Sequence, residues 1–263
     1  MLANQKYLPP SASELAVMSM AQARRQWVIT PEFIFSIFKE VNQTYKVFRA
    51  LKENGRLLRI DRARYVLAPC DNGLKINLPH PWVMARLWMD KLPYYIGYLT
   101  MYKHWGFSSK EPDSTFVLNP LRSRLIAVGA VRLRGFMIDP LKFYGLTKVR
   151  VDAESVCISD KERTLVDFIE YPGGDYSEVP KVLRRQLKQI DLEKFIHYLV
   201  RFPNLSLRRR GGYSLGQLGV SAQKLRRLKN SLGPPQYVAL NPFSGIRKGK
   251  INKEWGIIEN LYA

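Results

Sequence analysis

Hydrophobic residues recur at helical spacing through the first fifty residues of the chain. Ser11 with Glu14 has the pattern of a capping box, and the apolar residues that follow predict a first helix. Thr30-Pro31-Glu32 predicts the start of a second, because a hydroxyl N-cap, an early proline and an acid near the positive dipole end favour helix initiation. A third apolar stripe begins at Thr44 and ends at Asn54-Gly55, a pair typical of a helix C-cap.

The pattern then changes from helical period to alternation. Residues 58–67 alternate apolar and charged side chains and predict a two-stranded ribbon that turns near Asp61–Ala63. Three short helices followed by a basic hairpin are typical of a winged helix-turn-helix. Turn-forming residues at Cys70–Gly73 predict the boundary of this domain, which gives domains at 1–72 and 73–263.

The remaining chain mixes both periods. It predicts α+β architecture: an N-terminal winged helix, then a mixed α/β C-terminal domain with a helical C-terminal part. Helices are predicted at 81–92, 94–105, 162–171, 178–188, 191–201 and 214–231, and strands at 115–118, 125–131, 132–138, 148–151 and 155–158.

Charge divides unevenly along this pattern. The 263 residues carry 42 Lys+Arg and 22 Asp+Glu, for a net charge of +20, and 46% hydrophobic residues exclude a disordered basic tail. Residues 71–180 hold 14 basic and 13 acidic side chains, whereas residues 181–230 hold 13 and 2. The two positive regions predict faces that meet a polyanion, with an ordinary solvated surface as the alternative.

The third helix and the hairpin supply the candidate DNA contacts. In a winged helix the third helix enters the major groove, where Gln43 can pair with adenine and Arg49 with guanine. Phosphate contacts are expected from the other basic residues, and Tyr45 is a further outward residue of the third helix. The full set is Gln43, Tyr45, Lys46, Arg49, Lys52, Arg56, Arg59, Arg62 and Arg64. A protein-docking module is the alternative interpretation of this domain.

The second basic region supplies a further set of candidate phosphate contacts, in which affinity is expected to depend on salt and little on sequence. The set is Arg184, Arg185, Lys188, Arg208, Arg209 and Arg210. Structured RNA is an alternative partner for this block. The glycine pair at Arg210–Tyr213 is interpreted either as a close approach to phosphate or as a simple connector.

Several motifs, in order over about residues 45–263, resemble the AbiEi family, the antitoxins of type IV toxin–antitoxin systems. They are Tyr94–Tyr98, His104–Gly106, the Ser159–Asp167 segment SDKERTLVD, Tyr213–Gly219 and Gly249–Gly256. The resemblance implies an autorepressor that binds inverted repeats in the double-stranded DNA upstream of its own operon. It also implies that the second domain counteracts a nucleotidyltransferase-like toxin, without requiring a stable complex. The chain departs from the family at Ala63, where a wing glycine is usual.

Catalytic interpretations are weaker. In the ERTLVD segment, Glu162 starts a helix on which Arg163 and Asp167 form an i,i+4 pair, and we expect these three residues to be structural. The histidines and cysteines have no metal-ligand spacing, so neither metal nor cofactor is expected. A magnesium-dependent nuclease using Asp139 or Asp152 is the enzymatic alternative, although no Glu-x-Lys follows in register.

The compartment is inferred from two cysteines without a CxxC spacing, a pattern that fits a reducing cytosol. The apolar runs are too short to span a bilayer, and the first residues lack a signal-peptide pattern, so no membrane association is expected.

Overall fold

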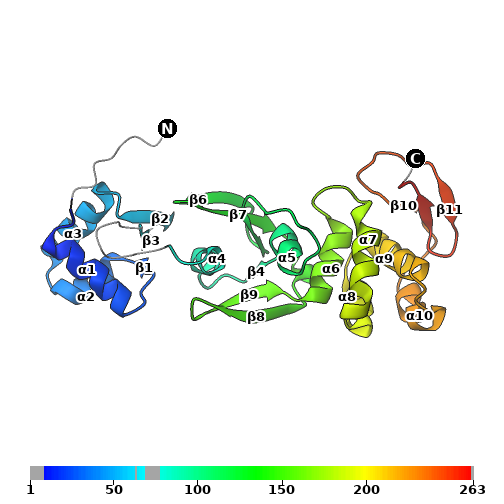
Figure 1. Ribbon diagram of the computed structural model, residues 1–263, viewed down its shortest axis with the longest axis horizontal. Helices are drawn as coiled ribbons and strands as arrows, with labels where there is room; N and C mark the ends of the chain where they lie inside the picture. Colours follow the sequence, from blue (N-terminus) through cyan, green and yellow to red (C-terminus); the bar gives the residue numbers. More distant parts are fainter. Residues whose placement is uncertain (1–8, 63, 69–77, 262–263) are drawn as a thin grey trace. The chain divides into compact units, whose positions relative to one another are not determined.

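The computed structural model describes residues 9–62, 64–68 and 78–261. These fall into two compact units. Unit 1 comprises residues 1–92, 124–134 and 150–155, and unit 2 comprises 93–123, 135–149 and 156–263. The mixed α and β composition predicted from the sequence is confirmed (Figure 1). The predicted boundary at 72/73 lies outside the described residues.

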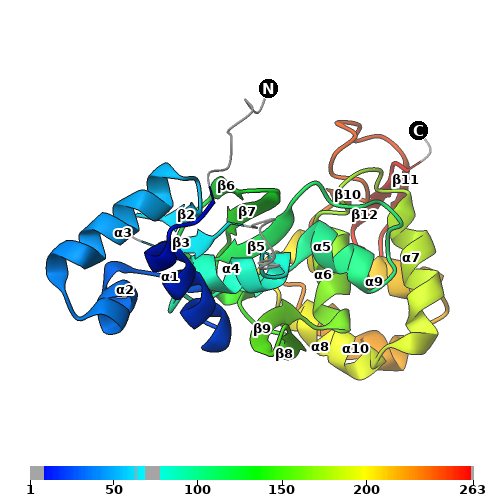
Figure 2. The same cartoon turned by 60° about the vertical axis from the view of Figure 1, so that its left-hand side comes forward.

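The three predicted helices at the start of unit 1 are present. Helix α1 (Ala12–Ala23) begins with the predicted capping box, in which the side chains of Ser11 and Glu14 each accept the other's backbone N–H. Helix α2 (Pro31–Phe38) follows strand β1 (Val28–Ile29) and is capped by Thr30. Helix α3 (Val41–Glu53) packs against both of the others (Figure 2).

The predicted ribbon is also present, as strands β2 (Leu57–Asp61) and β3 (Arg64–Leu67). They pair antiparallel, and β1 pairs with β3 to give a three-stranded sheet in the order β1-β3-β2. Apolar residues of α1, α2 and α3 pack with this sheet into one core around Met18, Ile34 and Leu51. Helix α4 (Pro81–Met89) lies next in the chain and belongs to the same unit.

A six-stranded sheet has the order β6-β7-β5-β4-β9-β8. Its central strand β4 pairs antiparallel with β5 and parallel with β9. The strands are β4 (Tyr95–Ile96), β5 (Thr115–Asn119), β6 (Arg124–Val128), β7 (Val131–Met137), β8 (Leu146–Val151) and β9 (Glu154–Ser159), with a 3-10 turn at Pro140–Lys142.

The single helix predicted over 94–105 is wrong at its start. Tyr95 and Ile96 form strand β4, and helix α5 (Tyr98–His104) begins only after Gly97. Helical spacing in this segment is overridden because Tyr95 and Ile96 find backbone partners on β5 and β9. A Cβ on Gly97 would lie 2.8 Å from the Leu118 and Tyr95 side chains, so glycine permits this close turn.

Unit 2 continues with helices around one large core. Helix α6 (Lys161–Glu170) is capped by Asp160, and α7 (Glu178–Gln186) runs into a 3-10 turn at Leu187–Gln189. Helix α8 (Leu192–Arg201) packs on α6 through its apolar face, which includes Phe195 and Leu199. The inward residues are therefore those that the apolar period indicates.

The helix predicted over 214–231 is two helices. Helix α9 (Leu205–Gln217) starts well before the predicted residue, at the Asn204 cap, and α10 (Ala222–Asn230) follows a break at Gly219. The glycine pair interpreted as a connector lies inside α9. A Cβ on Gly212 would lie 2.0 Å from the Trp255 ring, so this glycine makes room for the indole.

The chain ends in a small sheet of β10 (Val238–Ala239), β12 (Ile257–Glu259) and β11 (Lys250–Asn252). Strand β12 is parallel to β10 and antiparallel to β11. Within the described ranges, none of the helices combines the length and the hydropathy needed to cross a bilayer.

Candidate nucleic-acid interface

Helix α3 separates an apolar face from a basic one. Thr44, Val47 and Leu51 are buried against the other helices of unit 1. The opposite face carries Tyr45, which is 61% exposed, and the exposed cations Lys46, Arg49 and Lys52. This face follows from the period of the helix, because residues three and four apart share one side.

Few of these side chains are held by the protein. Arg49 Nε lies 2.7 Å from Glu53 Oε1, but both side chains are exposed, so this pair is weak. Lys52 Nζ lies 5.4 Å from the centre of the Tyr65 ring. For Lys46, the described part of the chain provides neither a hydrogen-bond acceptor nor an ion-pair partner. The face can therefore change partners at little cost.

Gln43, the predicted adenine reader, is half-buried beside α1. Its Nε2 donates to Ser13 Oγ at 3.2 Å, so it would have to release Ser13 to read a base. Asn42 was not predicted as a contact residue, because the apolar stripe of the third helix begins only at Thr44. It lies exposed in the first turn of α3, where its amide offers the same donor and acceptor pair as glutamine. The absence of a side-chain cap at Glu40 explains why the start of α3 is hard to predict.

The hairpin places only part of its charge outward. Arg59 and Arg62 are both exposed, and Arg59 bends over the turn and donates to the backbone oxygens of Asp61 at 3.2 Å and Arg62 at 3.3 Å. Ala63, where the chain departs from the family's glycine, lies outside the described residues.

Arg64, which was predicted to contact phosphate, is held by protein groups in this structure. Its guanidinium donates to the backbone oxygens of Leu87 at 2.9 Å and Trp88 at 3.1 Å, at the end of α4. It also pairs with Asp61 at 3.2 Å and Asp90 at 3.6 Å. A cation at this position donates to the last carbonyl oxygens of the helix, which lack partners, and is attracted to the negative end of the helix dipole.

Arg56 is likewise placed inside unit 1 rather than on its surface. It is 3% exposed, and its Nε lies 3.2 Å from Glu14 Oε1. Burial acts to raise the pKa of Glu14, but hydrogen bonds from Asn54 and Ser11 and the charge of Arg56 hold it below its usual value. The carboxylate of the predicted capping box therefore has a second role as the partner of a buried arginine.

The second basic set is also divided. Three of its residues lie on α7 and in the turn after it: Arg184, Arg185 and Lys188. Arg185 donates to the backbone oxygens of Gly106 and Phe107 at 3.1 and 3.3 Å. These residues remain candidates for phosphate contact, with Arg185 partly occupied.

On α9 the three successive arginines all donate to backbone oxygens of the protein. Arg209 is 4% exposed and donates to the backbone oxygens of Leu232, Pro234 and Trp255 at 3.1, 2.6 and 3.4 Å. Arg208 and Arg210 are half-buried and also donate to backbone oxygens. Phosphate contact by this run stays a prediction, and it would compete with the carbonyl oxygens that these donors already satisfy.

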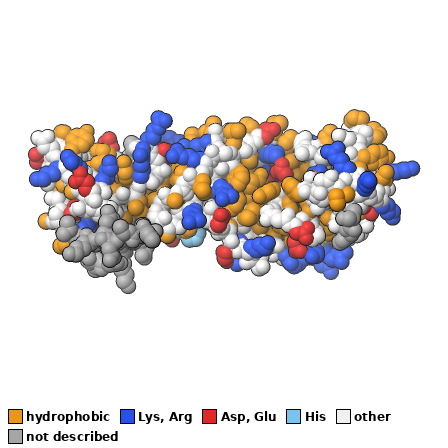
Figure 3. Space-filling model, turned by 90° about the horizontal axis from the view of Figure 1, so that it is seen from above, with side chains coloured by type: hydrophobic (Ala, Val, Ile, Leu, Met, Phe, Trp, Pro, Cys, Tyr) orange, Lys and Arg blue, Asp and Glu red, His pale blue; other side chains and the backbone are white. Residues whose placement is uncertain are grey.

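A further group of exposed cations of unit 2 lies on α10. Lys224, Arg226, Arg227 and Lys229 are exposed on a helix that contains no acid, and Lys229 pairs with Glu254 at 2.8 Å. On the face of the molecule shown in Figure 3, Lys and Arg side chains likewise gather in patches with fewer Asp and Glu between them. The charge count of residues 181–230 could have indicated α10, since four of its thirteen cations lie there.

The ERTLVD segment forms the buried start of α6. Arg163 and Asp167 are both 0% exposed, and Arg163 Nη1 lies 2.6 Å from Asp167 Oδ1. Arg163 also donates to the Lys142 backbone oxygen at 3.1 Å and to the Tyr95 hydroxyl at 3.2 Å. This confirms the predicted i,i+4 pair and joins α6 to β4.

Two carboxylates of this helix differ in environment. Burial raises the pKa of Asp167 to about 7, against the attraction of Arg163, and its Oδ2 accepts no hydrogen bond from the described residues. For Glu162, burial also acts to raise the pKa, but hydrogen bonds from Lys194 Nζ and the Asp191 N–H hold it below its usual value. No ligand-accessible cavity among those described reaches either group.

The two aspartates that a magnesium-dependent nuclease would use, Asp139 and Asp152, lie in turns. Asp139 accepts the backbone N–H of Leu141, and Asp152 accepts that of His80 at 2.9 Å. Among the described residues, no three His, Cys, Asp or Glu side chains gather as a metal site. Burial raises the pKa of the Cys157 thiol, which disfavours its reactive thiolate form.

Comparison with known proteins supports the fold alone. No protein-family model and no curated protein matches the chain. Among solved structures, the chain is similar to the crystal structure of the RV2827C protein from Mycobacterium tuberculosis. The match has a TM-score of 0.65 at 16% identity and covers 94% of this chain and 91% of that one. The two proteins therefore share a fold over nearly their whole lengths.

Proposed function

We propose that the chain is a sequence-specific DNA-binding protein in which α3 enters the major groove and the β2–β3 hairpin acts as a wing. The observation that carries the proposal is the exposed face of α3, on which Tyr45, Lys46, Arg49 and Lys52 have few protein partners. Asn42 adds a base-reading amide at the start of the helix. Arg62 extends the basic surface to the hairpin.

The test is fluorescence anisotropy of the full chain on its own upstream duplex and on a scrambled duplex, over a salt series. Sequence-specific regulators bind their sites about a thousandfold or more tighter than other DNA, and we expect a ratio in that range. The variant Asn42→Ala should reduce this ratio, whereas Lys91→Ala, an exposed cation of the same unit, should not. Equal affinity for both duplexes would refute sequence-specific binding.

We further propose that the protein is the antitoxin of a type IV toxin–antitoxin system that represses its own operon and counteracts a nucleotidyltransferase-like toxin. This part is supported by the resemblance of the ordered motifs to AbiEi proteins. Co-expression with the neighbouring toxin gene should restore growth. A variant with Lys46, Arg49 and Lys52 changed to Ala should lose repression but still restore growth, because the resemblance assigns antitoxicity to the second domain. Failure of the wild-type chain to restore growth would refute this role.

Binding of structured RNA is a second candidate, favoured by α10. Its exposed cations Lys224, Arg226 and Arg227 have no acidic residue on the same helix. Competition of a folded RNA against the upstream duplex distinguishes the two: RNA binding predicts that RNA displaces the duplex, and that changing these three residues to Ala removes the displacement. An RNA that does not compete would leave DNA as the nucleic-acid ligand.

A further inference from the structure

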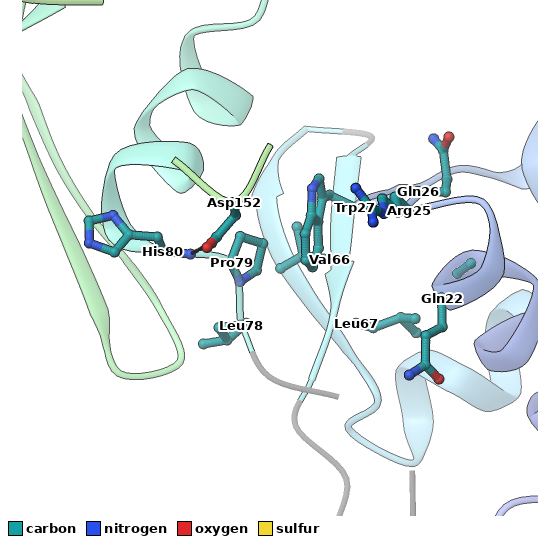
Figure 4. A pocket seen from close by; sticks show the side chains of 11 residues that line it. Gln22, Arg25, Gln26, Trp27, Val66, Leu67, Leu78, Pro79, His80 and Asp152 are labelled. Atoms are coloured by element: carbon teal, nitrogen blue, oxygen red, sulfur yellow. Dashed lines mark hydrogen bonds between the residues drawn. The ribbon is translucent and has the colours of Figure 1, made fainter. Parts of the chain in front are cut away.

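A cavity of about 490 Å³ opens in unit 1, away from the exposed face of α3. Its described walls come from the end of α1 and the turn to β1, from β3, from the residues before α4, and from the β8–β9 turn (Figure 4). The volume lies in the range that small-molecule sites occupy. None of the DNA contacts proposed above lines it.

The apolar part of the cavity is suited to a flat ligand. Trp27 stands beside Val66, with Leu78 and Pro79 facing the same space (Figure 4). Trp27 is half-buried, and its indole N–H donates to no acceptor among the described residues. An aromatic face with a few unsatisfied donors at its edge is the usual lining of a small-molecule site.

Arg25 contributes a charge in an unfavourable backbone conformation. Its φ is 50°, in the left-handed region, where it closes α1 through Arg25 N to Gln22 O and Gln26 N to Ala21 O. Glycine is the residue favoured at such a position, because a Cβ is strained there. Arg25 is exposed and lines the cavity, and its guanidinium has neither an ion pair nor a hydrogen bond within the described ranges. The fold therefore keeps a free cation at a place where stability favours glycine.

Asp152 limits the charge of the ligand. In Figure 4 it lies on the other side of Trp27 from Arg25, and it accepts the backbone N–H of His80 at 2.9 Å. A second anionic group near this carboxylate would be repelled. We propose that the cavity binds an organic monocarboxylate with a planar apolar body, whose carboxylate pairs with Arg25 and whose ring packs on Trp27.

Isothermal titration calorimetry of the full chain tests the site with naphthalene-2-carboxylate and its neutral counterpart naphthalene-2-methanol. A charge-assisted bond to Arg25 predicts that the carboxylate binds at least about tenfold more tightly. Arg25→Gly should reduce this ratio to about one without lowering Tm, because glycine relieves the left-handed strain. Trp27→Leu should weaken both probes.

Lys39 provides the matched control, because it is also an exposed cation in the left-handed region, at the end of α2, but does not line the cavity. Lys39→Gly should keep the tenfold preference and likewise not lower Tm. Binding of neither probe to the wild-type chain, or a preference that survives Arg25→Gly, would overturn the proposal. The experiment contains no DNA, so its outcome is independent of the proposed DNA binding.

Discussion

Helices α3 and α9 each carry three basic residues, and the structure places the two sets in opposite environments. On α3, Arg49 has a side chain that is 80% exposed, and Lys46 lies beside it on the surface. On α9, Arg209 is 4% exposed and donates to three backbone oxygens. Cations that stay hydrated are available to an external phosphate, whereas buried cations already hold the chain together.

The difference arises from what surrounds each helix. Helix α3 packs on one side only, against α1, α2 and β2. Helix α9 is enclosed by α6, α7, α8, α10 and β12, and Trp255 lies directly on Gly212. The irregular segments that pass near α9 expose carbonyl oxygens that need donors, and arginine supplies five. A basic run in the sequence therefore indicates a binding surface only when the helix that carries it has an uncovered face.

The largest effect is expected where a buried arginine balances a buried carboxylate. Arg56→Ala should lower the free energy of unfolding by about 3–5 kcal/mol, because Glu14 would remain charged in the interior. Urea unfolding followed by circular dichroism measures this loss. Arg62→Ala, an exposed change in the same hairpin region, should stay within about 0.5 kcal/mol. Equal stability of the two variants would remove the distinction between buried and exposed arginines.

Arg209→Ala sharpens the comparison in unit 2. We expect a loss of about 2–3 kcal/mol in unfolding free energy, because buried carbonyl oxygens of Leu232, Pro234 and Trp255 would be left without their donor. Arg227→Ala on α10 is the exposed control. If Arg209→Ala instead left stability unchanged and reduced the salt dependence of DNA binding, the run on α9 would be a phosphate contact after all.

The exposed cations of α3 should affect binding and leave stability nearly unchanged. Changing Lys46, Arg49 and Lys52 together to Ala should flatten the log–log salt slope of duplex binding by roughly 2.7, at about 0.9 for each phosphate that is no longer neutralised. The melting temperature should move by only about 2 °C, since each side chain is exposed. A slope equal to that of the wild type would place the phosphate-binding residues elsewhere.

The smallest expected effect is the pH dependence of the buried pair on α6. A free aspartate ionises near pH 4, whereas burial raises the pKa of Asp167 to about 7 in the folded chain. Between these values the folded state binds more protons, so the contribution of Asp167 to stability falls as pH rises from about 4 to about 7. Thermal melts should show a fall in melting temperature over this pH range that is absent in Asp167→Asn. Parallel curves for both proteins would contradict the raised pKa.

Local signals predicted most of the secondary structure. The caps at Ser11 and Thr30 and the alternation over 58–67 act between near neighbours, so the sequence alone defines α1, α2 and the β2–β3 hairpin. The errors occur where distant segments decide. Tyr95 and Ile96 become a strand because β5 and β9 lie on either side of them. Helix α9 is extended through two glycines because Trp255 fills the space beside Gly212.

The candidate site was predicted in outline and less well in its individual residues. Helical period correctly placed Lys46 and Arg49 outward, since that requires only the inward stripe to be known. Arg56 and Arg64 were predicted to contact phosphate because nothing near them in sequence indicates an acceptor. Their acceptors in the structure, Glu14 and the end of α4, are 42 and 23 residues away in sequence. Burial of an arginine depends on such distant acceptors, and charge patterning does not report them.

Unit 1 is discontinuous in sequence, and this affects how proteolysis or recombination can separate it from unit 2. The chain passes between the units at 92/93, 123/124, 134/135, 149/150 and 155/156. A single proteolytic cut or a single crossover in the gene therefore cannot release or exchange unit 1 whole, because residues 124–134 and 150–155 would stay with the other fragment. Proteins whose domains follow one another along the chain can acquire a new binding specificity by exchanging one whole domain. Here unit 1 can be exchanged only together with the segments of unit 2 that lie between its parts in the sequence.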